Sequence, residues 1–327
     1  MRRQLRLIAF VTIIIAAVAG SVVTGSDPPT TAAERAHAAE SGRSARHAGP
    51  TGISQPKVPA MITLPPTLRR QAARMSAGIL LDIDGGNVLW QKNADAPVPM
   101  ASMSKMMTAL IAVERIKARE YLALETPTTV SRAAAAIGGS QVWLAPGEVF
   151  TLGELLQATL VKSANDAAHA VAEAVVPDGN IRSFVTLMNR RARALGMPRG
   201  RFHNVHGLPG GKPALDNRAS CREMSRLALE LLKHPEARNW CKTRVAVFRD
   251  GSEHAVEMRN PNRLLSRCEG VNGIKTGYTR RAGYCVVATC VRHNRMLMAV
   301  VTGFRTKNDR ERFVADLLDC GYESVRQ

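Results

Sequence analysis

The chain has 327 residues, enough to bury a substantial core, and its 45% hydrophobic and 22% charged residues are typical of a globular protein. These proportions exclude disorder throughout, and an aromatic content of 4% disfavours a binder built on aromatic platforms. The net charge of +18 is spread over scattered arginines without a basic helix, so we expect no nucleic-acid partner and a surface suited to an anionic envelope.

The N-terminus has the pattern of an export signal. Arg2, Arg3 and Arg6 precede an uncharged run from Leu7 to Val23, and polar, proline-containing sequence follows. Residues 1–24 are therefore predicted to be a signal peptide, although the run is also long enough to be an uncleaved membrane anchor. We expect an exported protein of the periplasm or cell envelope.

Residues 25–70 are rich in Ala, Ser, Thr, Gly, Pro, Arg and His, which predicts a disordered linker before a single domain over residues 71–327. Two apolar runs around Gly85 and Gly86, SAGILLDID and NVLWQKN, predict a β-hairpin at the start of that domain.

The middle of the chain has helical periodicity. ASMSKMMTALIAVERIKA predicts a buried helix from about Ser102, and residues 151–195 carry three more helical patterns. Past residue 240, four short runs (VAVFRD, GIKTGYT, YCVVATCVR and RMLMAVVTGF) predict antiparallel strands before a final helix, RERFVADLLDCGY. The pattern indicates an α+β fold, in which N- and C-terminal strands form one antiparallel sheet packed with a helical region.

Three short motifs occur in a fixed order: Ser102-x-x-Lys105, Ser163-x-Asn165 and Lys275-Thr276-Gly277. A serine hydroxyl is a poor nucleophile near neutral pH and needs a neighbouring base. Positions i and i+3 share one helix face, so Lys105 can reach Ser102, and burial together with a second cation at Lys275 would lower the pKa of Lys105. Taken alone, this segment fits a core helix with a lysine that extends to solvent better than it fits a catalytic pair.

The other two motifs also have structural alternatives. Ser163 and Asn165 lie between two helical patterns, where they would face a cleft, cap the next helix, or do both. Gly277 leaves room on a strand for a substrate backbone, while Lys275 and Thr276 offer a charge and a hydroxyl suited to a carboxylate. The alternative is an edge strand with an exposed lysine.

This ordered motif set is the one found in penicillin-binding proteins and class A β-lactamases. The wider segments, including GGSQVWLAPGEVFTLGELLQATLVKSANDAAHAVAE, FHNVHGLP and GVNGIKTGYTRRAGYCVVAT, resemble the low-molecular-mass D-alanyl-D-alanine carboxypeptidases, the S11 serine peptidases. The resemblance covers about Ser76 to Tyr322 and implies the β-lactamase/transpeptidase-like fold.

The resemblance also implies roles. Ser102 would be the acylated nucleophile and Lys105 its proton acceptor, while Ser163 and Lys275 would pass protons to the leaving D-alanine. Asn165 would hold the penultimate amide of the substrate.

The remaining expected site residues would bind the substrate's end. Thr276 would lie near its terminal carboxylate beside Gly277, and Arg305 would pair with that carboxylate. The backbone N–H groups of Ser102 and Tyr278 would form the oxyanion hole.

The implied activity is removal of the terminal D-Ala from peptidoglycan stem peptides, without a cofactor or metal and with β-lactam antibiotics as inhibitors. Alanine replaces the usual glycine in S-x-N, Asn272 replaces the usual aspartate, and NRASCRE replaces the usual S-T-A signature. Alternatives are a D,D-endopeptidase, a β-lactamase, for which no convincing E-x-x-x-N segment is found, or a non-catalytic peptidoglycan-binding relative. A metallopeptidase using His203, His206 and Asp216 is a further alternative.

All six cysteines lie in the C-terminal third of the chain: Cys221, Cys241, Cys268, Cys285, Cys290 and Cys320. Because export and an even number permit disulfides, we expect some of them to pair. Cys285 and Cys290 are five residues apart on a predicted strand and would face opposite sides of it, so they should not pair with each other. Small buried thiols are the alternative.

Overall fold

The computed structural model describes residues 61–118 and 121–325. The predicted signal peptide at residues 1–24 and most of the predicted linker lie outside the described residues. Within the described ranges, no helix is both long and apolar enough to span a bilayer.

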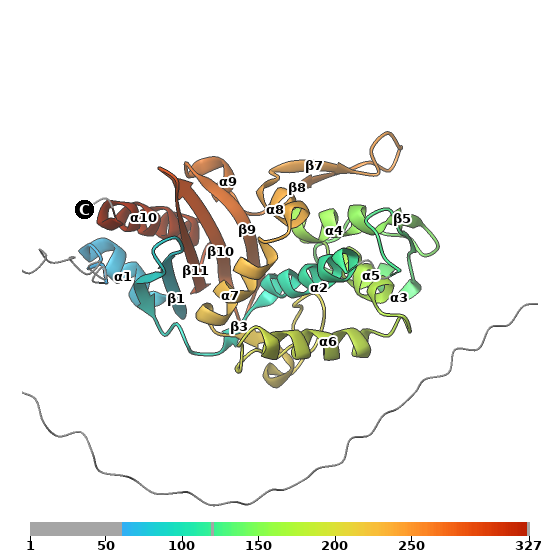
Figure 1. Cartoon of the computed structure of the whole chain (residues 1–327), viewed down its shortest axis with the longest axis horizontal. Helices are drawn as coiled ribbons and strands as arrows, with labels where there is room; N and C mark the ends of the chain where they lie inside the picture. The colour runs from blue at the N-terminus through green and yellow to red at the C-terminus, as the bar shows by residue number, and fades with distance from the viewer. Residues whose placement is uncertain (1–60, 119–120, 326–327) are drawn as a thin grey trace, which may run out of the picture. The chain divides into compact units, whose positions relative to one another are not determined.

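A five-stranded antiparallel sheet forms the centre of the fold (Figure 1). Its strand order is β2-β1-β11-β10-β9, so N-terminal strands pair with C-terminal ones as the sequence predicts. Its five strands are β1 (Ala77–Asp82), β2 (Asn87–Lys92), β9 (Val271–Thr279), β10 (Gly283–Arg292) and β11 (Arg295–Phe304). Strand β9, which contains the K-T-G motif, is an edge strand of this sheet and pairs with β10 on one side only.

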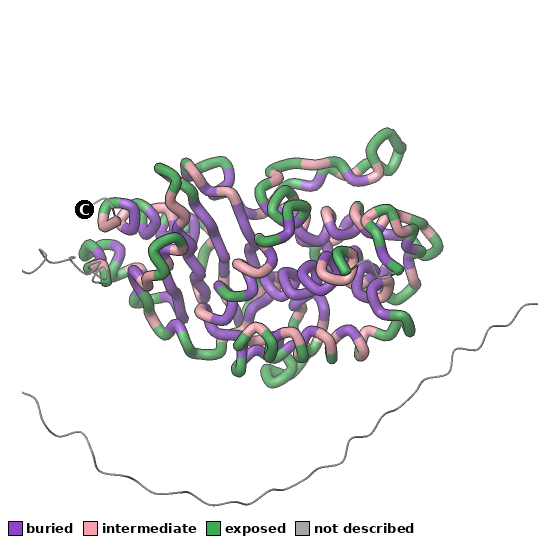
Figure 2. Tube along the Cα trace, viewed as in Figure 1, coloured by how far each residue is buried: buried purple, intermediate pink, exposed green. Residues whose placement is uncertain are grey.

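Helices cover both faces of this sheet. Helix α1 (Pro66–Arg74) and helix α10 (Lys307–Val325) lie on one side, and the helical region lies on the other (Figure 1). Strand β11 is accordingly buried over six consecutive residues, 297–302, instead of alternating (Figure 2). Leu68 and Phe313 belong to the core on the α10 side, whereas Met103 and Leu110 belong to the larger core on the other side.

The helical region surrounds α2 (Lys105–Lys117), which is buried from Lys105 to Val113 (Figure 2). Its other helices are α3 (Arg132–Ala135), α4 (Leu152–Val161), α5 (Asn165–Val175), α6 (Ile181–Ala194), α7 (Cys221–Leu231) and α8 (Pro235–Lys242). Capping boxes fix two of the starts, Thr151 with Glu154 for α4 and Ser220 with Glu223 for α7.

Smaller elements complete the fold. Three two-stranded sheets pair β3 (Val98–Pro99) with β6 (Arg218–Ala219), β4 (Pro127–Thr129) with β5 (Val149–Thr151), and β7 (Val245–Phe248) with β8 (Val256–Arg259). The short helix α9 (Leu264–Arg267) precedes β9, and 3₁₀ turns occur at Ala101–Ser104 and Pro213–Leu215.

The boundary between linker and domain needs correction. Helix α1 begins at Pro66, inside the stretch predicted to be a disordered linker to residue 70. Leu64 and Leu68 are buried against the sheet, so their apolar side chains stabilise this helix. The proline pair at Pro65 and Pro66 suggested a linker, but proline also suits a first helical position.

The cysteines also differ from expectation, because all six are thiols in the structure. Cys221, Cys241 and Cys285 are fully buried and pack as small apolar groups. Cys285 belongs to the core on one face of the sheet and Cys290 to the core on the other, which confirms that they face opposite sides.

Candidate active site

Ser102 lies in a tight turn that leads into the central helix. The sequence predicted a helix from about Ser102, but the structure has a 3₁₀ turn over Ala101–Ser104 and an α-helix that begins at Lys105. The turn still places the i, i+3 pair together, with Lys105 Nζ 3.2 Å from Ser102 Oγ. Ser102 is half-buried while Lys105 is fully buried, so solutes can reach the hydroxyl but not the amine.

Lys105 Nζ has two further partners, both of which can only accept its hydrogen bonds. Asn165 Oδ1 lies at 2.6 Å and the His206 carbonyl oxygen at 2.8 Å. A neutral amine has two N–H donors and one lone pair. In the structure Nζ donates to Ser102 Oγ as well, and in the neutral form, with both donors on these two acceptors, its lone pair can take the hydroxyl proton of Ser102.

The surroundings favour the neutral amine. Burial lowers the pKa of Lys105 well below its ordinary value, and the nearby Lys275 lowers it further, while Asp166 acts in the opposite direction. The expected effect of Lys275 on Lys105 is therefore present. A lysine that extends to solvent, the structural alternative for this segment, is excluded because Lys105 is 0% exposed.

Asn165 holds Lys105 from the first turn of α5. Its Nδ2 donates to the Gly138 carbonyl at 2.7 Å, which orients the amide so that Oδ1 faces Lys105. The alternative of a helix cap is wrong, because α5 begins at Asn165 itself and its N-cap residue, Ala164, makes no side-chain cap hydrogen bond.

A second serine and lysine pair comes from the other two motifs. Lys275 Nζ, on β9, donates to Ser163 Oγ at 2.7 Å and to the Thr276 carbonyl at 3.2 Å. Burial lowers the pKa of Lys275 to about 7, and Arg310 also lowers it while Cys241 raises it. Ser163 has a positive φ of 66°, which turns the loop between α4 and α5 toward β9.

Gly277 brings strand β9 close to the turn that carries Ser102. A Cβ at this position would lie 2.9 Å from the Met100 carbonyl oxygen and 3.2 Å from the Ser102 amide nitrogen. Because Gly277 has no side chain, β9 can contact this turn directly. The backbone around Tyr278 therefore lies near the Ser102 N–H. The sequence had indicated only room for a substrate.

The other predicted residues lie around this centre. Thr276 is buried next to Lys275, whereas Tyr278 is 54% exposed and stacks on Tyr284 with ring centroids 4.3 Å apart. Arg305 follows the last residue of β11 and is exposed. In the described residues no hydrogen bond or ion pair engages its guanidinium, so the structure does not join it to the other site residues.

Sequence reasoning missed the loop that supports Lys105 from behind. The His206 carbonyl belongs to the segment FHNVHGLP, which had been assigned to the resemblance and, through His203 and His206, to a candidate metal site. Thr108 Oγ1 anchors this loop to α2 through the Val205 carbonyl at 2.6 Å. A carbonyl partner leaves no residue-type signal, so only the loop's resemblance to the family could have indicated it.

The proposed metal ligands do not form a metal site. Within residues 61–118 and 121–325, no group of three His, Cys, Asp or Glu residues could hold an ion. Asp216 instead forms an ion pair with Arg281 at 2.6 Å, and burial lowers the pKa of His206 to about 3. This removes the basis for a metallopeptidase built on His203, His206 and Asp216.

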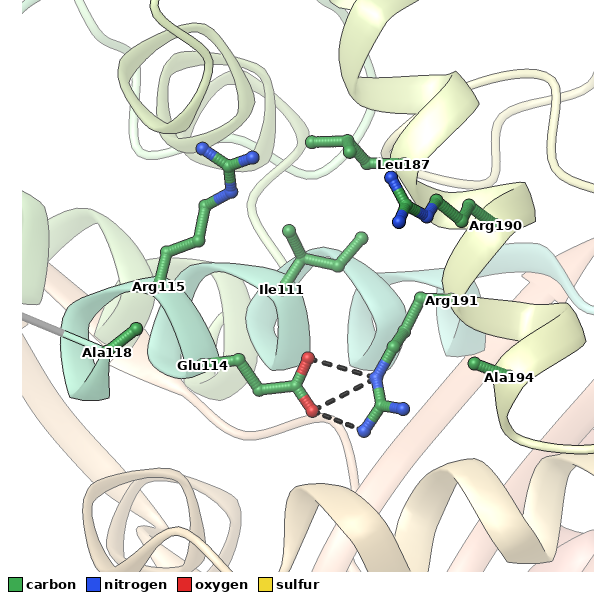
Figure 3. Close-up of a pocket in the computed structure, with 8 residues that line it drawn as sticks. All are labelled: Ile111, Glu114, Arg115, Ala118, Leu187, Arg190, Arg191 and Ala194. Atoms are coloured by element: carbon green, nitrogen blue, oxygen red, sulfur yellow. Dashed lines mark hydrogen bonds and ion pairs between the residues drawn. The ribbon is translucent and has the colours of Figure 1, made fainter. Parts of the chain in front are cut away.

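A separate pocket of about 290 Å³ lies between α2 and α6 (Figure 3). Glu114 and Arg191 form an ion pair on one side of it, and Ile111 and Leu187 lie on the other. None of the motif residues lines this pocket, so it is distinct from the centre around Ser102.

A serine with a buried lysine one turn away, and a second Ser–Lys pair on the edge strand of an antiparallel sheet, define the transpeptidase-like fold of penicillin-binding proteins. The chain belongs to the D-alanyl-D-alanine carboxypeptidase family (Peptidase_S11), which residues 65–306 match.

Similar proteins agree with this assignment. D-alanyl-D-alanine carboxypeptidase DacF of Bacillus subtilis is 34% identical over 77% of this chain, and DacC of Escherichia coli is 34% identical over 76%. The chain covers 63% and 60% of these two relatives. The ampicillin-bound penicillin-binding protein D2 of Listeria monocytogenes superposes with a TM-score of 0.67 at 25% identity, covering 76% of this chain and 98% of that one.

Proposed function

We propose that this chain is a serine D-alanyl-D-alanine carboxypeptidase that removes the terminal D-Ala from peptidoglycan stem peptides through an acyl-enzyme on Ser102. The observation that carries the proposal is the placement of the buried Lys105, whose Nζ lies 3.2 Å from Ser102 Oγ and is held there by Asn165 Oδ1 and the His206 carbonyl. Membership of the family supports the substrate class.

In the acylation step, Ser102 Oγ attacks the carbonyl carbon of the penultimate D-Ala while Lys105 Nζ takes its proton. The carbonyl oxygen becomes an oxyanion that the N–H groups of Ser102 and Tyr278 would stabilise. The close approach of Gly277 to the Ser102 amide supports this proposal, because it brings the strand that carries Tyr278 close to the turn that carries Ser102.

Breakage of the C–N bond releases D-Ala once its nitrogen receives a proton. Ser163 Oγ is held by Lys275 Nζ at 2.7 Å and would deliver that proton, with Lys275 replacing it. A lysine with a pKa of about 7 suits this role, since it can both give and regain a proton near neutral pH. Water then hydrolyses the ester on Ser102 and restores the enzyme.

Thr276 and Arg305 would recognise the terminal carboxylate of the substrate. Both residues follow from the resemblance, and the exposed guanidinium of Arg305 has no acidic partner in the described part of the chain. Strand β9 has a free edge alongside, where an extended peptide could add as a further strand.

The decisive experiment combines two reagents. Purified protein is incubated with diacyl-L-Lys-D-Ala-D-Ala and, separately, with a reporter penicillin, and both free D-Ala and covalent label are measured. We expect release of D-Ala and a long-lived penicillin adduct. Rapid loss of the adduct with hydrolysed penicillin would favour a β-lactamase. A lasting penicillin adduct without release of D-Ala would favour an endopeptidase, and neither product nor label would favour a non-catalytic binder.

We further propose that the protein is exported and acts at the cell envelope, with residues 1–24 as its signal peptide or its anchor. The arginines before the apolar run and the family membership support this location. Cell fractionation with N-terminal sequencing distinguishes the two fates, because a cleaved leader gives a soluble protein with a new N-terminus. Recovery of the chain in the cytoplasm would contradict export.

A further inference from the structure

A basic pocket of about 520 Å³ lies beside the first half of β9, away from Ser102. It is formed where strands β7 and β8 meet the segment before α9 and the start of α10. The residues that give it its chemical character are Arg244, Arg259, Arg263, Arg267, Lys307 and Asn262.

The pocket contains five cationic side chains, and acidic side chains neutralise only part of their charge. Arg259 pairs with Glu257, and Arg267 lies 3.4 Å from Glu311. In the described ranges, no hydrogen bond or ion pair joins the side chains of Arg244, Arg263 or Lys307 to a carboxylate. Burial and the charges of Arg263, Arg310 and Arg267 lower the pKa of Lys307, while Glu311 acts in the opposite direction. The pocket is therefore suited to an anion.

Asn262 adds a second, independent indication of a ligand. Its side chain is 1% exposed, and its Nδ2 donates to the Gly273 carbonyl at 3.1 Å. Its Oδ1 is buried without a hydrogen-bond partner. A buried acceptor of this kind is costly unless a donor reaches it. A ligand that carries a hydroxyl beside its anionic group can supply the donor that Asn262 Oδ1 lacks.

We propose that this pocket binds a phosphate ester of a polyol, with the phosphate among the arginines and a hydroxyl donating to Asn262. A phosphate offers more acceptor oxygens than a carboxylate and matches several guanidinium groups at once. Such groups occur both in phosphate-linked wall polymers and in lipid headgroups. Binding at this pocket is independent of the proposed activity, because it is measured without turnover.

The position of the pocket gives such a ligand a role beside the active strand. Gly273, whose carbonyl holds Asn262, is two residues before Lys275 on β9. A phosphorylated polymer held here would lie along the strand that carries the K-T-G motif. Binding in this pocket would thereby keep the enzyme close to the polymer.

The test is a binding titration with a fluorescent glycerol phosphate oligomer at low salt. The double variant Arg263→Gln/Arg267→Gln removes two pocket charges, and Arg182→Gln/Arg193→Gln removes two exposed charges from α6 as a control. We expect the pocket variant to bind at least about tenfold more weakly, and the control to bind within about twofold of the parent. Equal weakening in both variants would show general attraction to a cationic protein and overturn the proposal. Circular dichroism melting confirms that both variants fold.

Two further measurements test which groups of the ligand are recognised and where the ligand comes from. Glycerol 1-phosphate should compete better than methyl phosphate, and equal competition by the two would contradict the contact between a hydroxyl and Asn262. Vesicles containing phosphatidylglycerol, compared with the soluble oligomer, identify the source. Arginine-dependent binding to either supports the pocket, and its absence with both overturns it.

Discussion

Lys105 Nζ and Asn165 Oδ1 lie 2.6 Å apart, although 60 residues separate them in the chain. The other end of the Asn165 amide donates to Gly138, so the whole side chain is committed within the protein. The resemblance implied that Asn165 holds the substrate, but this geometry gives it a positioning role as well. It fixes the amine that we propose takes the proton of Ser102.

Asn165→Asp is predicted to move the pH profile of acylation. A carboxylate at this distance favours protonated Lys105, so the pKa of Lys105 rises and less neutral amine is present at pH 7. The second-order rate of penicillin acylation should fall at least about tenfold at pH 7, and its acid limb should shift to higher pH. Stopped-flow acylation across pH 5 to about 10 measures both. A uniform loss with an unshifted limb would contradict the positioning role.

Ser102→Ala is predicted to abolish covalent labelling by penicillin, because the strained amide meets the same nucleophile and oxyanion donors as the substrate. Intact-mass spectrometry after exposure to excess penicillin should show one adduct on the parent and none on the variant. Peptide mapping should place the adduct on Ser102. A label on another residue would overturn the assignment of the nucleophile.

Lys275→Met is predicted to change how stability depends on pH. The folded-state pKa of Lys275, about 7, lies below the ordinary value of 10.5. Between these values the unfolded chain binds more protons than the folded chain, so this residue makes stability rise with pH. Removing it should reduce the slope of unfolding free energy by about 1.4 kcal/mol per pH unit over that range.

Urea denaturation of both proteins at several pH values between 7.5 and about 10 gives the slopes directly. The difference between parent and variant isolates Lys275 from cysteines and tyrosines that titrate in the same range. Parallel stability curves would mean that Lys275 keeps an ordinary pKa in the folded state.

Arg305→Ala is predicted to reduce the selectivity for a free terminal carboxylate. A guanidinium–carboxylate pair is lost only with substrates that end in a carboxylate. The loss in kcat/KM should be at least about tenfold larger for a D-Ala-D-Ala peptide than for its C-terminal amide. Equal losses on both peptides would assign Arg305 a structural role.

Gly277→Ala is predicted to slow acylation and to destabilise the fold. The added methyl group would meet the Met100 carbonyl oxygen and the Ala101 side chain, at 2.9 and 3.1 Å. Relief requires strand β9 to move away from the nucleophile turn, at a cost of about 1–3 kcal/mol. Thermal melting and penicillin acylation measure the two effects. Gly86→Ala is a useful comparison for acylation, because nothing lies within 4 Å of its Cβ position and its positive φ of 68° would cost stability without moving β9.

Much of this fold could be predicted from the sequence because its periodicities are strong. The runs around Gly85, the K-T-G strand and the final helix all form where predicted, as β1, β2, β9 and α10. Helix α1 was not predicted from the sequence. Its stability comes from contacts with the sheet, and its prolines and arginines give no sign of these contacts. Likewise, the pattern of six cysteines does not reveal that five of them are buried in the two apolar cores.

For the site, residue types predicted the Ser102–Lys105 pair, but not the partners of Lys105. Helix geometry is local and follows from spacing, which explains the first success. The contacts with His206 and Gly138 use backbone carbonyls, which every residue has. Only the folded chain shows which of them arrive at the site.

The partners at the site are far apart in the chain, since 101 residues separate Lys105 from His206 and 112 separate Ser163 from Lys275. Loops of this length close only when the sheet and the helical region have both assembled. A partly folded chain would have Ser102 without a deprotonated base or an oxyanion hole. Penicillin labelling would thus count only molecules that have completed folding, and its rate of appearance after dilution from denaturant would time the last step of assembly.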